Sequence, residues 1–195
     1  MRMTLITPPA TEPVTLTEAK AHLRVDTSDD DALITREISA GRQLVENWAR
    51  RALITQTWQM VLDKAPAGFD IPLPPLQEVT KIETIDDAGT KTEVSSLLYF
   101  VDLGQGSNGR VQLRRGCFWP HHRGFASFIV SFKCGYGAAA AVPEALKEAI
   151  LKLVALFYEN RDVGESLGIV TNDSMVLQPT FQLLQPFKTF MRPLS

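Results

Sequence analysis

The sequence has few cysteines and no long apolar run. Cys117 and Cys134 are its only cysteines, and no C-x-x-C pair is present. A structural zinc site takes four ligands that usually come in such pairs, so we expect no zinc site and two reduced thiols. No stretch approaches the about 20 apolar residues that cross a membrane, and residues 1–15 lack the apolar core of a signal peptide. We therefore expect a protein that is synthesised in the cytoplasm and has no membrane partner.

The chain also lacks a basic excess. It has 20 Lys and Arg against 22 Asp and Glu, a formal net charge of −2. A protein that mainly coats duplex nucleic acid needs a clear positive excess to neutralise phosphates, so that class is not favoured. Acidic residues are nevertheless absent from residues 103–143, where the basic residues are Arg110, Arg114, Arg115, Arg123 and Lys133. This basic segment is a candidate binding surface.

The motifs of common enzyme classes are missing. There is no G-x-S-x-G, H-E-x-x-H or G-K-[ST]. Residues 104–109 do read G-x-G-x-x-G, but a dinucleotide site needs a helix directly after this loop and an acidic residue about 20 positions further on. Here residues 110–113 alternate like a strand, and the next acidic residue is Glu144. We therefore expect these glycines at the tip of a hairpin rather than at a nucleotide.

Histidines and carboxylates are not arranged for metal binding or catalysis either. His121 and His122 are adjacent, and neighbours on an extended segment point in opposite directions, so they are poorly placed to share one ion. The acidic residues 29–31 suit the positive end of a helix dipole, which explains them without chemistry. We expect no catalytic residue, no metal and no cofactor, and hence no enzyme.

Helical periodicity appears in two separate parts of the chain. Thr15 precedes Glu18 by three residues, the spacing of a capping box, which predicts a short helix there. A second helix is predicted after residues 29–31, and a third from Pro143, a residue typical of the first helical position. Apolar stripes repeat along the two longer helices: Ile34, Ile38, Gly41, Val45, Trp48 and Ala52 in one, and Leu146, Ile150, Leu153 and Phe157 in the other.

Alternation with a period of two begins at Ile54 and predicts a strand over residues 54–62. Three prolines in residues 71–79 mark a bend or a sheet edge, because proline cannot donate to a β ladder. A turn signal at residues 87–89 separates two further strand-like runs. With the later runs, the pattern predicts about six short strands in a small antiparallel β unit.

The expected fold class is α+β. Neither helical region is large enough to form a core alone. We therefore expect residues 1–53 and 138–162 to pack as a small helical bundle, with residues 54–137 inserted as the antiparallel β unit. Residues 163–195 are expected to form an extended C-terminal docking tail, in which three prolines limit any helix to short pieces. Because the end of this tail is apolar, we expect it to dock, either on its own domain or on another subunit.

Two groups of residues are candidates for contact with a partner or a channel. In the basic segment, arginines alternate with aromatic residues, which is typical of protein–protein hot spots and also of nucleic-acid contact. The acidic chain as a whole favours a protein partner, or a channel lining that tolerates DNA, although single arginines are also common on solvated surfaces. The candidates are Arg110, Arg114, Arg115, Trp119 and Arg123, and in the tail Phe181, Leu184, Phe187, Phe190 and Met191.

Four stretches resemble the head–tail adaptor family, also called connector or head-completion proteins, of long-tailed bacteriophages and gene transfer agents. In order they are PVTLTEAKAHLRVDTSDDDALI (13–34), VENWARRALITQTW (45–58), IPLPPLQEV (71–79) and VPEALKEAILKLVALFYENR (142–161), with a weaker echo in LLQPFKTF (183–190). No single stretch is diagnostic, but four in the same order are fairly specific. The predicted helices near Thr15, Ser28 and Pro143 would correspond to the helical body of the family.

This resemblance implies a structural role in the neck of a virion or phage-like particle in bacteria. Family members form a ring on the portal, so a homo-oligomeric ring of twelve copies is expected. The implied partners are the portal protein, a tail-side neck or stopper protein, and DNA that passes through the channel without sequence-specific binding. The family offers no catalytic residues. The alternative is a small nucleic-acid-binding module that uses residues 110–133.

Overall fold

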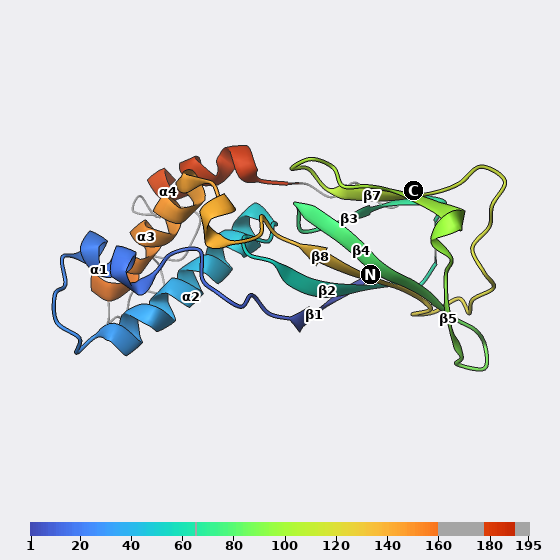
Figure 1. Ribbon diagram of the computed structural model, residues 1–195, viewed down its shortest axis with the longest axis horizontal. Helices are drawn as coiled ribbons and strands as arrows, with labels where there is room; N and C mark the ends of the chain where they lie inside the picture. Colours follow the sequence, from blue (N-terminus) through green and yellow to red (C-terminus); the bar gives the residue numbers. More distant parts are fainter. Residues whose placement is uncertain (65, 160–177, 190–195) are drawn as a thin grey trace. The chain divides into compact units, whose positions relative to one another are not determined.

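The computed structural model describes residues 1–64, 66–159 and 178–189, which form two compact units (Figure 1). The sheet unit comprises Met1–Ala10, Arg50–Gly137 and Thr189, and the helix unit comprises Thr11–Ala49 with residues 138–159 and 178–188. All described strands lie in the first unit and all described α-helices in the second, so the α+β class predicted from the sequence is confirmed. None of these helices is long and apolar enough to cross a membrane.

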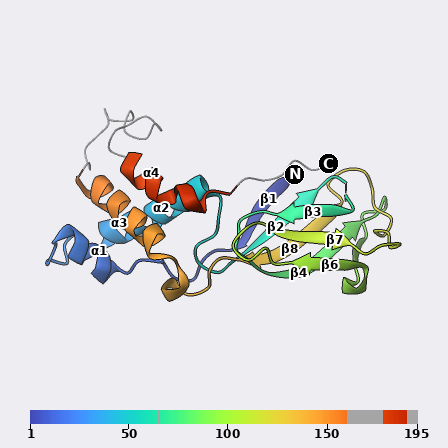
Figure 2. The ribbon, with the colours of Figure 1, turned by 90° about the horizontal axis from the view of Figure 1, so that it is seen from above.

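The strands described in the sheet unit pair antiparallel in two sheets (Figures 1 and 2). A 3₁₀ turn, η1 (Ser96–Leu98), directly precedes strand β6 (Tyr99–Asp102). The five-stranded sheet has the order β1 (Arg2–Thr7), β2 (Gln56–Leu62), β8 (Phe128–Cys134), β4 (Leu76–Ile85) and β5 (Lys91–Glu93). The three-stranded sheet has the order β3 (Gly68–Ile71), β7 (Gly109–Leu113) and β6 (Tyr99–Asp102).

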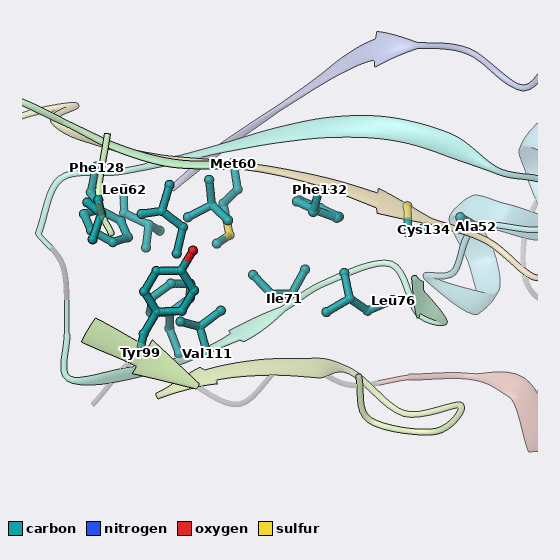
Figure 3. Close-up of a cluster of buried hydrophobic side chains, with 14 residues drawn as sticks. Ala52, Met60, Leu62, Ile71, Leu76, Tyr99, Val111, Phe128, Phe132 and Cys134 are labelled. Atoms are coloured by element: carbon teal, nitrogen blue, oxygen red, sulfur yellow. The ribbon is translucent and has the colours of Figure 1, made fainter. Parts of the chain in front are cut away.

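The core of the sheet unit lies between the two sheets (Figure 3). Alternate residues of β8, from Phe128 to Cys134, are completely buried, as expected for a strand with one face on a core. Phe69 and Ile71 of β3 and Val111 of β7 close this core from the other sheet. The rings of Phe69 and Phe128 meet edge to face, 5.7 Å apart. Each such buried side chain stabilises the unit by roughly 1.5–3 kcal/mol.

Strand β1 is the main departure from the domain boundaries predicted from the sequence. Residues 1–10 were expected with the helices but belong to the sheet unit, because β1 pairs with β2 at the edge of the larger sheet. Only Met3 of this strand is even half-buried, so no alternating pattern marks it in the sequence. The apolar stripe of the second helix also ends earlier than expected, at Ala49, and Ala52 lies in the core of the sheet unit.

The described residues of the helix unit form α1 (Leu16–Leu23), α2 (Asp31–Ala49), α3 (Glu144–Glu159) and α4 (Gln178–Leu184), with 3₁₀ turns η2 (Ala139–Ala141) and η4 (Gln185–Phe187). The predicted capping box is present at α1. The Thr15 N–H donates to the Glu18 carboxylate at 2.7 Å, and the Glu18 N–H donates to the Thr15 hydroxyl at 3.2 Å. The first of these bonds is the main reason that the pKa of Glu18 lies below its ordinary value.

The predicted apolar stripes of α2 and α3 face each other and form the core of the helix unit. This packing explains why neither helical segment needs a core of its own, although they are far apart in the chain. The fully or almost fully buried members are Ile34, Ile38 and Val45 in α2 and Leu146, Ile150 and Leu153 in α3.

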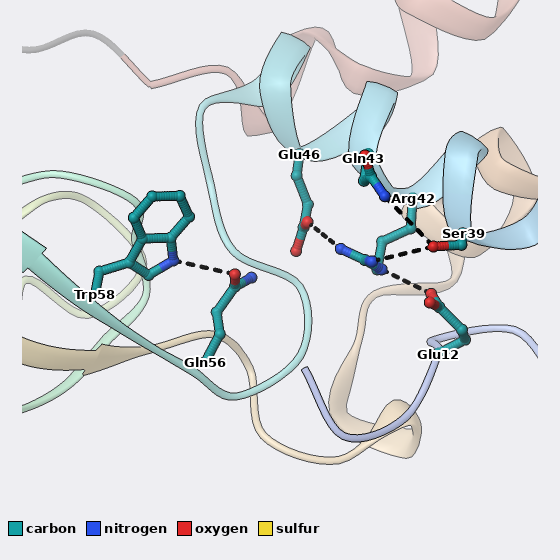
Figure 4. A network of polar contacts seen from close by, with 7 residues as sticks. All are labelled: Glu12, Ser39, Arg42, Gln43, Glu46, Gln56 and Trp58. Carbon is teal, nitrogen blue, oxygen red and sulfur yellow. Dashed lines mark hydrogen bonds and ion pairs between the residues drawn. The ribbon is translucent and has the colours of Figure 1, made fainter. Parts of the chain in front are cut away.

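A buried arginine fastens the segment before α1 to α2 (Figure 4). The Arg42 Nε donates to the Glu12 carboxylate at 2.7 Å, and its Nη1 donates to the Glu46 carboxylate at 2.6 Å. Burial alone would lower the pKa of the Arg42 guanidinium, but its bond to Glu12 and the charges of both carboxylates raise that pKa above its ordinary value. A buried guanidinium requires such pairing, so this network fixes the position of Glu12 on α2.

Candidate functional site

Most of the basic segment lies on residues 114–127, the connection from β7 to β8 (Figure 1), which we call the crossing loop. At its start the Arg114 N–H donates to the Leu98 carbonyl at 2.8 Å, next to the three-stranded sheet. At its end the Ser127 N–H donates to the Leu62 carbonyl at 3.2 Å, in the five-stranded sheet. The loop therefore covers the end of the sheet unit at which β2 and β7 end and β6 and β8 begin.

Trp119 holds the middle of the crossing loop against the core. Its indole N–H donates to the Pro66 carbonyl at 3.0 Å, and its ring centre lies 4.9 Å from that of Phe128 and 6.0 Å from that of Tyr99. Burial, with a smaller effect of Glu93, raises the pKa of the Tyr99 hydroxyl. Trp119 is thus a packing residue in this structure, and its direct contact with a partner stays a prediction.

The residue before Trp119 points the other way. Phe118 is 82% exposed, Phe125 of the same loop is 74% exposed, and Leu97 of η1 is 77% exposed. These are the three most exposed large apolar side chains among the described residues, and we call them the apolar tip. The sequence pointed to Trp119 instead, and it offered no reason to select Leu97 or Phe125. The only local indication in the sequence is that each of these three residues is next to or near an apolar residue that is buried or half-buried. Leu97, for example, is followed by the half-buried Leu98.

The predicted arginines do not form one cluster. Arg110 lies on the outer face of the three-stranded sheet, in register with Asp70 of β3 and Asp102 of β6. Arg114 lies elsewhere, with its guanidinium carbon 3.9 Å from the ring centre of the exposed Phe100. The Arg110 Nη2 donates to the Gln112 side-chain oxygen at 3.3 Å, with the two carboxylates as its cross-strand neighbours. The ring of Phe100 holds Arg114 in a cation–π contact.

Two of the three arginines on the crossing loop, Arg115 and Arg123, are close in sequence to Phe118 and Phe125 of the apolar tip. Arg115 is exposed, and Arg123 is half-buried with its Nε donating to the Phe125 carbonyl at 3.1 Å. Carboxylates lie here too: Asp63 accepts the Ala126 N–H at 2.9 Å, and Asp87 is 3.0 Å from His121. A segment without acidic residues in sequence is therefore interspersed with carboxylates in space.

The glycine motif at residues 104–109 forms the tip of the hairpin between β6 and β7, as the sequence predicts. Gly104 and Gly106 have φ angles of 72° and 98°, in the left-handed region that favours glycine. A Cβ on Gly109 would lie 2.2 Å from the Leu76 side chain, so this position excludes any larger residue. Since a strand follows, the loop lacks the helix N-terminus on which a pyrophosphate sits.

The tail residues that were candidates for a partner contact are packed inside the helix unit where the structure describes them. Phe181 is 8% exposed and stacks on Trp48 of α2, with ring centres 5.2 Å apart. Leu184 is completely buried, and Phe187 is half-buried. The sequence left open whether the tail docks on its own domain or on another subunit. The described part of the tail, α4, docks on its own domain. Phe190 and Met191 lie outside the described residues.

Groups that could hold a metal do not gather in the part of the chain that the structure describes. His121 contacts Asp87, whereas the His122 Nδ1 is 3.0 Å from the Pro120 carbonyl. Neither Cys117 nor Cys134 forms a disulfide in the structure. The absence of a catalytic, metal or cofactor site stays a prediction.

Residues 13–96 match the family described as phage gp6-like head–tail connector protein. The resemblance to head–tail adaptors that the sequence predicts is thus confirmed over this part of the chain. No curated protein matches the chain significantly.

Chains from three solved structures share the fold. They come from the neck of an empty gene transfer agent (GTA) particle computed with C6 symmetry (23% identity, TM-score 0.78), the virion of a native GTA particle (23%, 0.77) and the neck of a native GTA particle computed with C12 symmetry (22%, 0.75). Each alignment covers 100% of this chain and 98% of the other. At this identity the likeness concerns the fold, over the whole length of both chains.

Proposed function

We propose that this chain is a structural head–tail adaptor, which forms a ring between the portal and the tail-side proteins of a phage-like particle and continues the DNA channel. The observation that carries this proposal is the fold likeness, which extends over 98% of a chain from a GTA neck with a TM-score of 0.78. The connector match over residues 13–96 supports the same role. Such a protein works through surfaces, without turnover of a substrate.

A ring of twelve copies is the assembly that we propose. One of the similar chains belongs to a neck computed with C12 symmetry. A closed ring of identical subunits uses two different, complementary faces on each copy. The acidic start of α2 at residues 29–31 and the crossing loop differ in charge and in apolar character, as two such faces should.

The proposed partners are the portal protein on one side and a tail-side neck or stopper protein on the other, with DNA passing through without sequence-specific contact. The proposed location is the neck of a virion or phage-like particle, after synthesis in the bacterial cytoplasm. In the tail, Phe187, Phe190 and Met191 are the candidates for a contact with a neighbour, since Phe181 and Leu184 pack within the helix unit.

The alternative of a nucleic-acid-binding module is less favoured. Duplex binding requires a surface with a clear positive excess. Three of the basic side chains of residues 110–133 lie beside carboxylates: Arg110 is in register with Asp70 and Asp102, His121 is 3.0 Å from Asp87, and Lys133 is 3.2 Å from Glu78. A phosphate backbone approaching this segment would meet negative charges as well as positive ones.

Particles assembled without this chain test the proposal. We expect tailless heads that lose their DNA, seen by negative-stain electron microscopy, and tailed particles again when the full chain is supplied in trans. Normal yields of tailed particles without the chain would refute an adaptor role. For the alternative, the purified chain should bind a duplex with an affinity that falls steeply with salt and is lost in Arg114→Ser/Arg115→Ser.

A shorter truncation separates the tail contact from the fold. Removal of residues 190–195 leaves α4 intact, whereas the larger deletion of residues 177–195 also removes Phe181 and Leu184 from the helix unit. We expect the shorter chain to remain folded and to join fewer heads to tails. Joining at the normal yield would exclude Phe190 and Met191 from the interface.

A further inference from the structure

Each sheet of the sheet unit has two edge strands, and the four edges differ in character. β5 consists of three exposed residues with a charge at each end, and β3 includes Gly68 and Asp70, two residue types that are depleted in strands. Natural proteins protect free edges with charges, prolines or very short strands. β1 and β6 contain neither lysine nor proline, and exposed apolar side chains lie along or next to both: Leu5, Ile6, Phe100, Val101 and Leu103. β1 and β6 are therefore the two edges best suited to pairing with a further strand.

The backbone of β6 presents Tyr99 and Val101 to its open edge. The Arg114 N–H donates to the Leu98 carbonyl at 2.8 Å, so Leu98 directs its backbone groups toward the strand β7. Successive residues of a strand direct their N–H and C=O groups to opposite sides. Tyr99 and Val101 therefore direct theirs away from β7, to the side on which β6 pairs with no strand among the described residues.

The same alternation places Met3 and Leu5 at the open edge of β1. The Leu62 carbonyl accepts the N–H of Ser127, the residue before β8, at 3.2 Å. Leu62 and every second residue of β2 therefore direct their backbone groups toward β8, and the residues between them direct theirs toward β1. In the register of β1 with β2, the residues opposite these are the even-numbered ones. The backbone groups of Met3 and Leu5 thus face away from β2.

The two open edges match in their apolar side chains. An antiparallel pairing with Met3 opposite Val101 and Leu5 opposite Tyr99 brings together the backbone groups that both edges leave open. Tyr99 and Met3 each pack on the core of the sheet unit, so all four side chains would lie on the same side of the joined strands. Within the three-stranded sheet, Val101 is already opposite the buried Val111, and Met3 would extend this apolar row.

The same register also matches the charges on the outer side. Asp70, Arg110 and Asp102 lie in one row across the three-stranded sheet, with alternating sign. Arg2 would come to lie opposite Asp102 and continue this alternation, which is favourable for cross-strand pairs. The Asp102 Oδ1 accepts the Gly104 N–H at 3.0 Å, so the guanidinium would approach the other oxygen. In a parallel pairing, Arg2 would lie at the opposite end of β6 from Asp102.

We propose that β1 of one copy pairs antiparallel with β6 of the next copy in the ring, and joins the five-stranded sheet of one subunit to the three-stranded sheet of its neighbour. This inference rests on the proposed function, because it takes the chain to form a ring. β1 and β6 lie on opposite sides of the sheet unit (Figure 2). The contact is therefore head to tail, as a closed ring of identical subunits requires, and the two strands supply a further pair of complementary faces.

Disulfide crosslinking in assembled particles tests this register. In a Cys117→Ser background, Thr4→Cys and Phe100→Cys introduce two cysteines that would be directly opposite, with Cα atoms roughly 4.5 Å apart, a separation that a disulfide can span. We expect oxidation to give a ladder of reducible multimers beyond the dimer on denaturing gels, because every copy carries both cysteines. Circular dichroism and the yield of tailed particles show whether the variant folds and assembles.

The matched control is Thr4→Cys with Val101→Cys, which is out of register by one residue and would place the two thiols on opposite sides of the joined strands. We expect roughly a tenth of the product from this pair, because disulfide geometry is specific. Dimers from Thr4→Cys alone would mean that two β1 strands pair with each other. That result, equal products from the two cysteine pairs, or the absence of a ladder from assembled particles would each overturn the proposal.

A charge variant tests the same contact without new cysteines. Arg2→Glu would place two carboxylates opposite each other at every interface of the ring, so the yield of tailed particles should fall several-fold, whereas Arg2→Lys should keep the parent yield. A normal yield with Arg2→Glu would exclude this register.

Particles without the chain separate this inference from the adaptor role. If they are tailless but the matched cysteines give no ladder, the strand pairing is wrong and the adaptor role stands. If the ladder forms but particles without the chain are tailed, the adaptor role is wrong and the contact between copies stands.

Discussion

The apolar tip and the apolar tail look alike in the sequence but differ in the structure. Both place large apolar residues in segments rich in proline, glycine or polar residues, outside the long helices. Phe181 and Leu184 are 8% and 0% exposed, whereas Phe118 and Phe125 are 82% and 74% exposed. The tail finds a complementary surface within its own unit, where Trp48 stacks on Phe181. At the tip, Trp119 already covers the core, so its neighbours remain outside.

The largest loss of folding stability is expected for a substitution in the tail. Replacing the completely buried Leu184 with alanine should lower the free energy of unfolding by about 3 kcal/mol, through lost burial and the cavity left behind. Urea denaturation followed by circular dichroism measures this change. Gln182→Ala, on the exposed side of the same helix, should change it by less than about 0.5 kcal/mol. Equal effects of the two variants would mean that α4 is not part of the core.

A smaller loss is expected for Trp119→Ala, about 2–3 kcal/mol, because the indole is only partly buried although it packs on Phe128 and binds the Pro66 carbonyl. The same urea titration applies. Trp119→Phe is the matched control, since it keeps ring packing and removes the hydrogen bond, and it should recover at least half of the loss. If Trp119→Ala were neutral, the end of the sheet unit would not depend on this ring.

Lys188 provides a further test of how the tail packs on α2. Its Nζ lies 4.6 Å from the ring centre of Trp48, so Lys188→Gln should remove a cation–π contact and lower stability by about 0.5 kcal/mol. Lys188→Arg keeps a cation over the ring and should match the parent chain in thermal unfolding. A larger loss for the arginine variant than for the glutamine variant would argue against this contact.

The smallest effect is expected at the tip. Phe118→Ala should change the free energy of unfolding by less than about 0.5 kcal/mol, because an 82% exposed ring contributes little burial. Paired with Trp119→Ala in one urea series, it compares two adjacent aromatic residues. A loss above about 1 kcal/mol at Phe118 would mean that its ring contributes to the packing of the fold.

Much of the local structure follows from short stretches of sequence. The capping box at Thr15 and Glu18, the stripes of α2 and α3, and the hairpin tip at residues 104–109 are all as expected. Each depends on backbone geometry and on side chains within a few positions of one another. The strand that the sequence predicts after the glycines is present as well, in place of the helix that a nucleotide loop needs.

The candidate site was less predictable. In an extended segment, adjacent side chains point to opposite sides, but the sequence does not tell which side faces the core. The sequence therefore could not decide which of the adjacent Phe118 and Trp119 lies on the surface. Carboxylates near the basic segment were also hidden, because Asp63 and Asp87 come from other parts of the sheet unit. Strand β1 was not predicted because its side chains are mostly exposed and show no alternating apolar pattern. It is held in the sheet by its backbone pairing with β2, which is distant in the chain.

The sequence by itself determined the positions of α1, α2 and α3, the hairpin turn at residues 104–109 and the family that the chain resembles. These features depend on residues that are close together in the chain. Only the tertiary structure decided that Phe181 and Leu184 lie inside while Phe118 and Phe125 lie outside. Whether an apolar side chain is buried depends on whether residues distant in the chain supply a matching surface, and α2 supplies one for the tail. For the tip, the residues that the structure describes supply no such surface.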